Sequence, residues 1–187
     1  MIYLIDMDGV VADFERELLD QFRKLYPNKN YVSLDKRTTS TTEEQYPLED
    51  RPLLRSITSS PGFFLNLKPI EGSLNALLEL KSISGNEVFL CSSPTNIYKQ
   101  CVQEKYMWVE QHLGHEWTQK IILTKDKTLV YGNYLIDDNS NIKGIKTPFW
   151  EHVIYDQPYN RNLEHLNGKK RISWQGNWRE VLDIHQK

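Results

Sequence analysis

A pair of carboxylates near the start of the chain, Asp6 and Asp8, has the residue types and the spacing to do chemistry. The pair follows a continuous apolar run, Ile2–Ile5, and Gly9 comes directly after it. Such a run is typical of a strand buried on both faces. Carboxylates at its end can attack an electrophile, transfer protons or bind a cation. A calcium loop and a surface turn are the alternatives, but an EF-hand has its glycine at position six, whereas Gly9 is at position four.

Three further polar clusters each follow a short apolar run: Ser92–Ser93, Thr124–Lys127 and Asp137–Asp138. If these runs are parallel strands, their carboxyl ends meet in one crevice, which is where such sheets bind ligands. The clusters supply carboxylates, hydroxyls and amines, the groups needed for phosphoryl transfer through an aspartyl-phosphate. A carboxylate at ~4 Å from a phosphate meets about 4 kcal/mol of repulsion per pair of charges at an effective dielectric constant of 20. Mg²⁺ and a lysine ammonium can offset this repulsion.

The elements that must position these clusters are indicated by apolar periodicity. Continuous apolar runs predict strands at 2–5, 88–91, 121–123, 134–136 and 152–155. Helical spacing occurs at 14–26, 74–78, 98–113 and 174–182. The alternation predicts an α/β fold, a Rossmann-like doubly wound parallel sheet. Residues 31–61 are polar and weakly periodic, and they indicate an excursion that is partly helix and partly loop.

Length and composition bound the classes of protein. A chain of 187 residues is expected to form one domain with a small insertion. The formal net charge of −2 favours neither a nucleic-acid polymer nor a membrane as partner. Cys91 and Cys101 form no metal motif, and two thiols in a chain of this size favour a reducing compartment. We expect a cytoplasmic protein that is a monomer or a homodimer.

A series of motifs makes a family resemblance specific. In order, the chain carries DMDGVVADF at 6–14, CSSP at 91–94, EKYMWVE at 104–110, LTKDKT at 123–128, LIDD at 135–138 and WEHV at 150–153. The series resembles the haloacid dehalogenase superfamily of phosphatases, and within it the 5′(3′)-deoxyribonucleotidase family. The resemblance covers residues 1–28 and the chain from residue 63 onward.

The resemblance implies roles for the catalytic and phosphate-binding residues. Asp6 would be the nucleophile, and Asp8 the general acid and base. Ser92 and Ser93 would bind the phosphate, and Lys127 rather than Lys125 would neutralise it. On its own, Ser92 in a Ser-Ser-Pro sequence is more often a helix N-cap, and both roles are compatible because a helix N-terminus attracts anions.

The resemblance also implies a cofactor and a division of the chain. Mg²⁺ would be held by the Asp6 carboxylate, the Asp8 main-chain carbonyl and Asp138. Asp137 would support these ligands without binding the ion itself. Residues 1–14 and 63–187 would form the α/β core. Residues 15–62 would form a small, mainly helical cap that is inserted after the first strand and closes over the substrate.

The residues that would hold the group carrying the phosphate are less well defined. Phe14, Phe63, Phe64 and Asn139 are possible pocket residues, although the aromatic ones could equally belong to the core. The cap loop around Thr38–Thr41 has no aromatic residue, where the family has an aromatic pair. The prediction is a Mg²⁺-dependent phosphomonoesterase for deoxynucleoside monophosphates. A phosphatase for another small metabolite, such as a sugar phosphate, and a catalytically silent binding protein are the alternatives.

Overall fold

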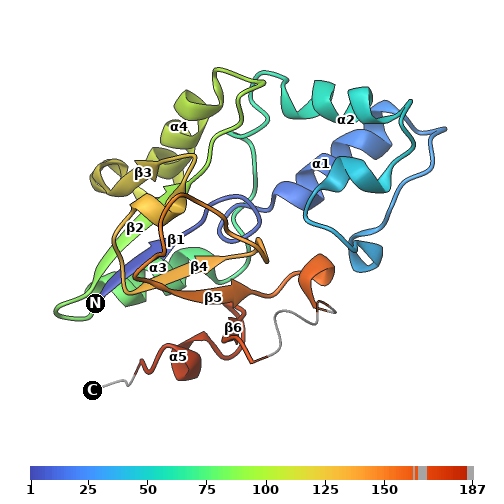
Figure 1. Cartoon of the computed structure of the whole chain (residues 1–187). Helices are drawn as coiled ribbons and strands as arrows, with labels where there is room; N and C mark the ends of the chain where they lie inside the picture. Colours follow the sequence, from blue (N-terminus) through green and yellow to red (C-terminus); the bar gives the residue numbers. More distant parts are fainter. Residues whose placement is uncertain (162, 164–167, 185–187) are drawn as a thin grey trace.

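The computed structural model describes residues 1–161, 163 and 168–184. Its centre is a six-stranded, fully parallel sheet with the order β3-β2-β1-β4-β5-β6 (Figure 1). The strands are β1 (Ile2–Ile5), β2 (Glu87–Ser92), β3 (Ile121–Leu123), β4 (Tyr134–Asp137), β5 (Glu151–Tyr155) and β6 (Arg171–Ile172). Ile5 lies opposite both Leu90 and Ile136, so the central strands end at the same edge. The predicted α/β, Rossmann-like parallel sheet is confirmed.

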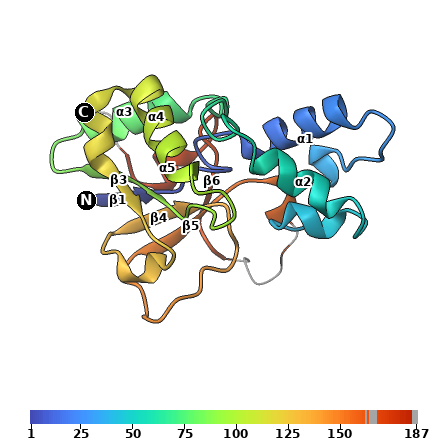
Figure 2. The same cartoon turned by 90° about the horizontal axis from the view of Figure 1, so that it is seen from above.

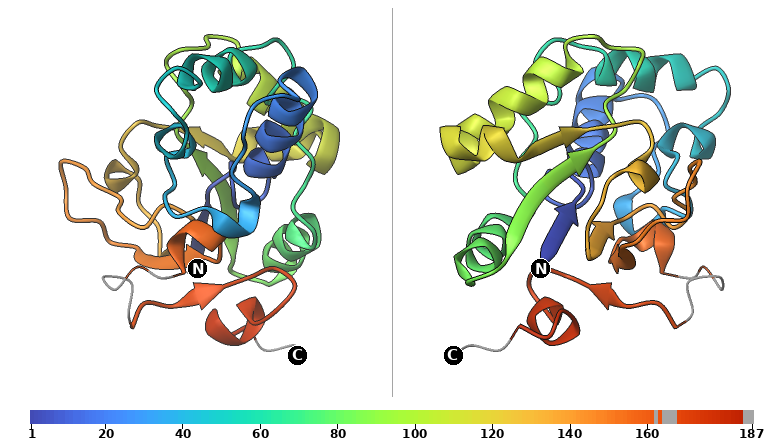
Figure 3. Two further views of the ribbon diagram at one scale, coloured as in Figure 1. Left: turned by 90° about the vertical axis from the view of Figure 1, so that its right-hand side faces the viewer. Right: turned by 60° about the vertical axis from the view of Figure 1, so that its left-hand side comes forward.

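The helices form two groups. The α-helices are α1 (Phe14–Leu25), α2 (Arg51–Thr58), α3 (Ser73–Ser82), α4 (Cys101–Leu113) and α5 (Trp178–Val181). The 3-10 helices are η1 (Leu34–Lys36), η2 (Thr42–Gln45), η3 (His115–Lys120), η4 (Lys127–Leu129) and η5 (Pro158–Asn160). Helices α1 and α2 pack on each other beyond the carboxyl ends of the strands, away from the sheet (Figures 1 and 2). Helix α5 lies with β6 at the opposite end of the molecule (Figure 3).

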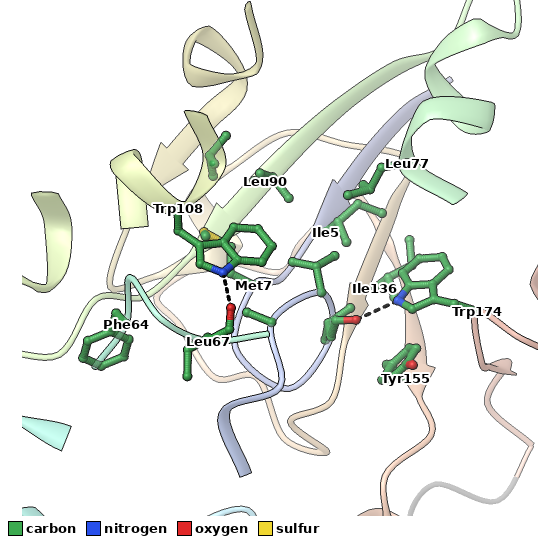
Figure 4. Packing of buried hydrophobic residues seen from close by; sticks show 14 of the residues in the cluster. Ile5, Met7, Phe64, Leu67, Leu77, Leu90, Trp108, Ile136, Tyr155 and Trp174 are labelled. Carbon is green, nitrogen blue, oxygen red and sulfur yellow. Dashed lines mark hydrogen bonds between the residues drawn. The ribbon is translucent and has the colours of Figure 1, made fainter. Parts of the chain in front are cut away.

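The two faces of the sheet are covered differently. Side chains alternate along a strand, so Ile5 and Ile136 point into the large core, where helices α3, α4 and α5 contribute apolar residues (Figure 4). Leu4 and Leu135 point to the other face and meet Trp150, Val130 and other residues of the segment that joins β3 to β5. Between β3 and β5, where every residue outside β4 is described, this second layer consists of the short helix η4 and loops.

Three local features differ from the sequence-based expectations. Strand β6 was not predicted, because two residues are too few to show a period. Helix α4 begins at Cys101 and not at Tyr98, and α5 covers only residues 178–181 of the expected 174–182. Among the described residues, none of the helices has the length and apolar character needed to span a bilayer.

The chain leaves the core toward α1 and returns to it after α2, and the leaving and returning segments lie side by side. Ala12 and Pro69 form an antiparallel bridge, and Asp13 N donates to the Lys68 carbonyl at 2.8 Å. Two buried indoles hold these segments to the core, as Figure 4 shows: Trp174 Nε1 donates to the Val10 carbonyl and Trp108 Nε1 to the Leu67 carbonyl, both at 2.7 Å. Residues 13–68 are attached to the core through these adjacent segments, through the hydrogen bonds of Glu104 to Gly62 and Phe64, and through contacts between η1 and η5.

Candidate active site

The loop that follows β1 fixes the first carboxylate. Asp6 N donates to the carbonyl of Ile136 on β4 at 2.9 Å, which continues the sheet by one residue. Met7 N donates to Asp6 Oδ1 at 2.8 Å and orients the carboxylate. The Met7 carbonyl accepts from Val11 N and Ala12 N, both at 2.9 Å, so the loop closes on itself directly after the strand.

Gly9 lets this loop approach the second acidic site. Its φ angle is +78°, a conformation that L side chains rarely adopt. A Cβ atom at this position would lie 2.8 Å from Asp138 Oδ2 and 3.2 Å from the Tyr159 hydroxyl. The glycine is thus needed both for the turn and for the contact between the loop and the end of β4.

Lys127 is the cation of the site. Its Nζ lies 2.9 Å from Asp6 Oδ1 and 2.6 Å from Asp137 Oδ2. Burial alone would lower the pKa of Lys127, but the two carboxylates raise it above its ordinary value. Trp150 Nε1 donates to the Lys127 carbonyl at 3.2 Å and anchors η4. Lys125, two residues earlier, is exposed.

The adjacent acids at the end of β4 have different surroundings. Asp137 is buried, and its two oxygens accept from Lys127 Nζ and, at 2.8 Å, from Asn139 N. Burial and the charge of Asp6 raise the pKa of Asp137 to about 6. The Tyr159 hydroxyl donates to Asp138 Oδ2. Burial, followed by the charges of Asp137 and Asp6, raises the pKa of Asp138 well above its usual range.

These four residues, Asp6, Lys127, Asp137 and Asp138, are called the Lys127 cluster below. Oxygens of the three carboxylates lie within 4.8 Å of one another, and among the described residues Lys127 is the one cation paired with them, through Asp6 and Asp137. Three hard oxygen donors with an excess of negative charge are the set that Mg²⁺ prefers. The pKa values of Asp137 and Asp138 are raised by the same causes, first burial and then the negative charges of neighbouring carboxylates. The donor set therefore fits the predicted cation.

Asp8 is held by Lys105, a residue that the sequence reasoning did not single out. Lys105 Nζ lies 2.6 Å from Asp8 Oδ1, and the lysine is 1% exposed. The same ammonium lies 5.1 Å from the centre of the Phe64 ring. A buried lysine must have a charged or hydrogen-bonded partner. In the sequence, the signal for Lys105 was its position in the EKYMWVE motif, but no chemistry was assigned to this lysine.

Glu104, the residue before Lys105, holds the segment that returns from α2 to the core. Its carboxylate accepts from Gly62 N at 2.8 Å, from Phe64 N at 3.0 Å and from the Tyr98 hydroxyl at 2.5 Å. Two successive residues of α4 thus position the acid–base candidate and the segment that carries Phe64.

Ser92 and Ser93 lie on either side of the end of β2. Ser92 is the last residue of the strand and 1% exposed, whereas Ser93 is exposed and lines the pocket described next. The expectation that Ser92 caps a helix is wrong, because α4 begins only at Cys101, with Gln100 before it. The Ser-Ser-Pro sequence ends a strand here, and a loop of eight residues follows.

A cavity of about 280 Å³ lies between the core and the α1–α2 segment. It is called the cap pocket, and its lining residues are Asp8, Phe14, Leu18, Ser40, Thr41, Thr42, Glu43, Leu54, Thr58, Phe64, Ser93, Thr95 and Ile97. A second cavity, of about 170 Å³, shares Asp8 and Ser40 with the cap pocket and is also lined by Asp138 of the Lys127 cluster.

The four pocket residues expected from the sequence, three phenylalanines and Asn139, occupy different places. Phe14 and Phe64 line the cap pocket, with ring centres 6.2 Å apart. Phe63 is 1% exposed and packs edge-on against both rings, as a core residue would. Asn139 is exposed, and its side chain accepts from Asn141 N at 3.0 Å.

The fold and the arrangement at the strand ends define the class of protein. A haloacid dehalogenase-like family hydrolase from Xanthomonas campestris superposes with a TM-score of 0.53 at 10% identity, over 98% of this chain and 94% of that one. The chain thus has the haloacid dehalogenase-like fold.

Sequence comparison gives the family within that fold. The model of the family described as "5′ nucleotidase, deoxy (Pyrimidine), cytosolic type C protein" matches residues 1–186, and the chain belongs to this family. The human cytosolic-type 5′(3′)-deoxyribonucleotidase is 46% identical over 96% of this chain and 92% of its own length. The human mitochondrial 5′(3′)-deoxyribonucleotidase is 38% identical over 96% and 81%. The predicted family is confirmed, as is the prediction of an enzyme that is a phosphoric monoester hydrolase of the 5′-nucleotidase type.

Proposed function

We propose that the chain is a Mg²⁺-dependent phosphatase for deoxynucleoside 5′- or 3′-monophosphates that works through an aspartyl-phosphate on Asp6. The observation that carries the proposal is the Lys127 cluster, in which an ammonium lies within 2.9 Å of the Asp6 carboxylate beside two further acids. The printed names of the relatives support the substrate class.

In the first step a carboxylate oxygen of Asp6 attacks phosphorus, and the bond from phosphorus to the ester oxygen breaks. The leaving oxygen takes a proton from Asp8, which lies two residues after the nucleophile and lines the cap pocket. In the second step Asp8 takes a proton from water. The resulting hydroxide attacks phosphorus, phosphate is released and Asp6 is regenerated.

Charge neutralisation is the main task of the surroundings. Lys127 lowers the repulsion between Asp6 and the phosphate, and the hydroxyls of Ser92, the last residue of β2, and of Ser93, the next residue, are proposed to donate to phosphoryl oxygens. Mg²⁺ would be held by Asp6, Asp138 and the Asp8 carbonyl, and when bound it would supply further charge neutralisation and orientation. Asp137, with both oxygens engaged, keeps Lys127 in place.

Residues 15–62 are proposed to act as a cap that closes over the substrate and excludes water. The bridge between Ala12 and Pro69 supports this role, because the two chain crossings between the core and this segment lie side by side there and can serve as a hinge. A cytoplasmic location is supported by the cytosolic-type relative. A monomer or a homodimer stays the prediction for the assembly.

A panel of phosphomonoesters with a magnesium titration tests the proposal. Deoxynucleoside monophosphates should release phosphate faster than sugar phosphates, and the activity should disappear after exhaustive EDTA treatment and return with Mg²⁺. The exposed hydroxyls of Ser40 and Thr41 on the cap wall also suit a polyol, so a sugar phosphate is the second candidate. A clear preference for sugar phosphates would reject the nucleotidase proposal, and full activity in EDTA would reject the metal.

A further inference from the structure

Asp138 differs from the other acids of the Lys127 cluster in the kind of partner it has. Lys127 Nζ lies within 2.9 Å of oxygens of Asp6 and Asp137, but among the described residues no cationic side chain pairs with Asp138. Its Oδ2 accepts from the Tyr159 hydroxyl instead, and its Oδ1 accepts no hydrogen bond from the described part of the chain. A neutral phenol therefore holds this carboxylate by one oxygen and adds no positive charge.

The phenol is held in place by the turn that carries it. Tyr159 is the middle residue of η5 and is 5% exposed. Asn160 Nδ2 donates to the Asp138 carbonyl at 2.9 Å, and Gln157 Nε2 donates to the Gly9 carbonyl at 2.7 Å. These two bonds tie η5 to the residue after β4 and to the loop after β1. The hydroxyl thus has a fixed position relative to both places.

The surroundings of Asp138 leave its side chain room to turn. Asp138 and Tyr159 together line two small cavities, of about 180 and 170 Å³, and the second of these is also lined by Asp8. On a third side the Gly9 backbone comes so close that a Cβ there would lie 2.8 Å from Asp138 Oδ2. Rotation of the carboxylate into either cavity would break its bond to the hydroxyl, so Tyr159 opposes that rotation.

We propose that Tyr159 is a positioning residue that strengthens Mg²⁺ binding by holding the Asp138 carboxylate in one orientation. This inference rests on the part of the proposed function that places Mg²⁺ at the Lys127 cluster. A ligand that is already oriented loses less conformational freedom when an ion binds. Hydrogen bonds that orient a metal ligand in this way typically change metal affinity by about 10- to 100-fold.

The direction of the effect distinguishes positioning from competition. If the phenol occupied the oxygen that the ion needs, it would have to be displaced on binding, and its removal would strengthen binding. A phenol that orients the carboxylate and leaves the other oxygen available strengthens binding, and its removal weakens it. We expect the second result because Asp138 Oδ1 has no donor among the described residues.

The test measures binding of Mg²⁺ alone. Tyr159→Phe removes the hydroxyl and keeps the ring. Calorimetric titration of the metal-free chain with Mg²⁺, without substrate, should give a Kd at least about 10-fold higher for Tyr159→Phe than for wild type. The matched control is Tyr155→Phe, because Tyr155 is also 5% exposed and, among the described residues, its hydroxyl donates to none of the three carboxylates. An unchanged or lower Kd in Tyr159→Phe overturns the inference.

Urea unfolding separates positioning from a purely structural role. A structural bond alone would lower the free energy of unfolding in EDTA and leave the Kd for Mg²⁺ unchanged. Positioning predicts in addition that a fixed concentration of Mg²⁺ stabilises Tyr159→Phe less than it stabilises Tyr155→Phe, because the stabilisation depends on the ratio of ion concentration to Kd. Equal stabilisation of the two variants contradicts the inference.

Turnover separates the inference from the proposed function. In Tyr159→Phe the Mg²⁺ concentration for half-maximal activity should rise about 10-fold, whereas kcat at saturating Mg²⁺ should stay within about 2-fold of wild type. If no nucleotide is hydrolysed but the two Kd values differ as expected, the inference stands and the substrate assignment fails. If wild type binds no Mg²⁺, the metal assignment fails and the inference with it.

Discussion

The two ends of the proposed substrate site are built from different kinds of structure. At the phosphate end, carboxylates and an ammonium come from residues directly after parallel strands, and contacts of 2.6–2.9 Å join them. At the cap end, the polar groups come from η2, α2 and the loop before them, and Ser40 and Thr41 are exposed. The sheet holds the first set whether or not substrate is present, whereas a few local contacts hold the second. Substitutions should accordingly affect turnover at one end and substrate choice at the other.

The largest effect is expected at the nucleophile. Asp6→Asn keeps the shape of the side chain and its place after β1 but removes the attacking carboxylate. We expect kcat to fall by about 10⁴-fold or more, with the fold retained. Phosphate release at saturating Mg²⁺ measures this, and Asp20→Asn on the exposed side of α1 is the control. Unchanged turnover would show that Asp6 is not the nucleophile, and it would contradict the assignment of turnover to the phosphate end.

Removal of the buried ammonium tests whether charge balance organises the phosphate end. Lys127→Met leaves Asp6 and Asp137 without their common partner. We expect kcat/KM to fall about 10³-fold and the free energy of unfolding in EDTA to fall by about 3 kcal/mol. Urea unfolding of the variant beside Lys125→Met, the exposed neighbour, checks the second value. Equal stability of the two variants would contradict the proposed charge balance.

A third substitution tests the link between the two ends. Lys105→Met removes the partner of Asp8, which remains partly exposed at 28% and keeps contact with water. We expect kcat to fall about 100-fold with little change in KM, because the carboxylate loses its orientation for proton transfer. The pH profile of kcat should change in Lys105→Met, recover in part in Lys105→Arg and stay unchanged in Lys99→Met, an exposed control. A purely structural role would leave the profile intact.

The phosphate end should also make stability depend on pH through His152. Burial, with Lys169 and Lys127 nearby, lowers the pKa of His152 to about 4, below the usual 6.5. The unfolded chain therefore binds a proton at a higher pH than the folded chain does. The stability due to neutral His152 is present above pH 6.5 and is lost as the pH falls toward 4, by about 2 kcal/mol. Urea unfolding at pH 7.5 and 4.5 should give a smaller loss in His152→Gln than in wild type or in exposed His115→Gln. Equal losses in all three would contradict this.

The smallest effect is expected at the cap end. Thr41→Ala removes one pocket hydroxyl, and a hydrogen bond of this kind is worth about 0.5–1 kcal/mol. KM for a nucleotide should rise about 2- to 5-fold, while kcat and inhibition by inorganic phosphate stay the same. Ser82→Ala at the exposed end of α3 is the control. A loss of kcat in Thr41→Ala would mean that the cap takes part in the chemistry itself.

The difference between the phosphate end and the cap end also explains which residues of the site could be predicted from the sequence. The residues of the Lys127 cluster were predicted because each follows an apolar run, and parallel strands bring their ends together. Lys105 was missed because it lies in the middle of a helix, where a lysine is usually solvated. Tyr159 was missed because η5 has no apolar period to mark it. The placement of Ser40 and Glu43 in a pocket depends on tertiary packing between short 3-10 helices, which local patterns do not encode.

The strand order has a consequence for synthesis of the chain. β1 lies between β2 and β4, so its second edge stays unpaired after β2 is complete and until Asp137 has been made. At 5–20 residues per second this interval lasts roughly 2–9 s on the ribosome. During it, the open edge of an apolar strand is a template for pairing with other chains. The segment that brings Lys127 and Asp137 to the nucleophile thus also ends the period in which the nascent chain is most prone to aggregate.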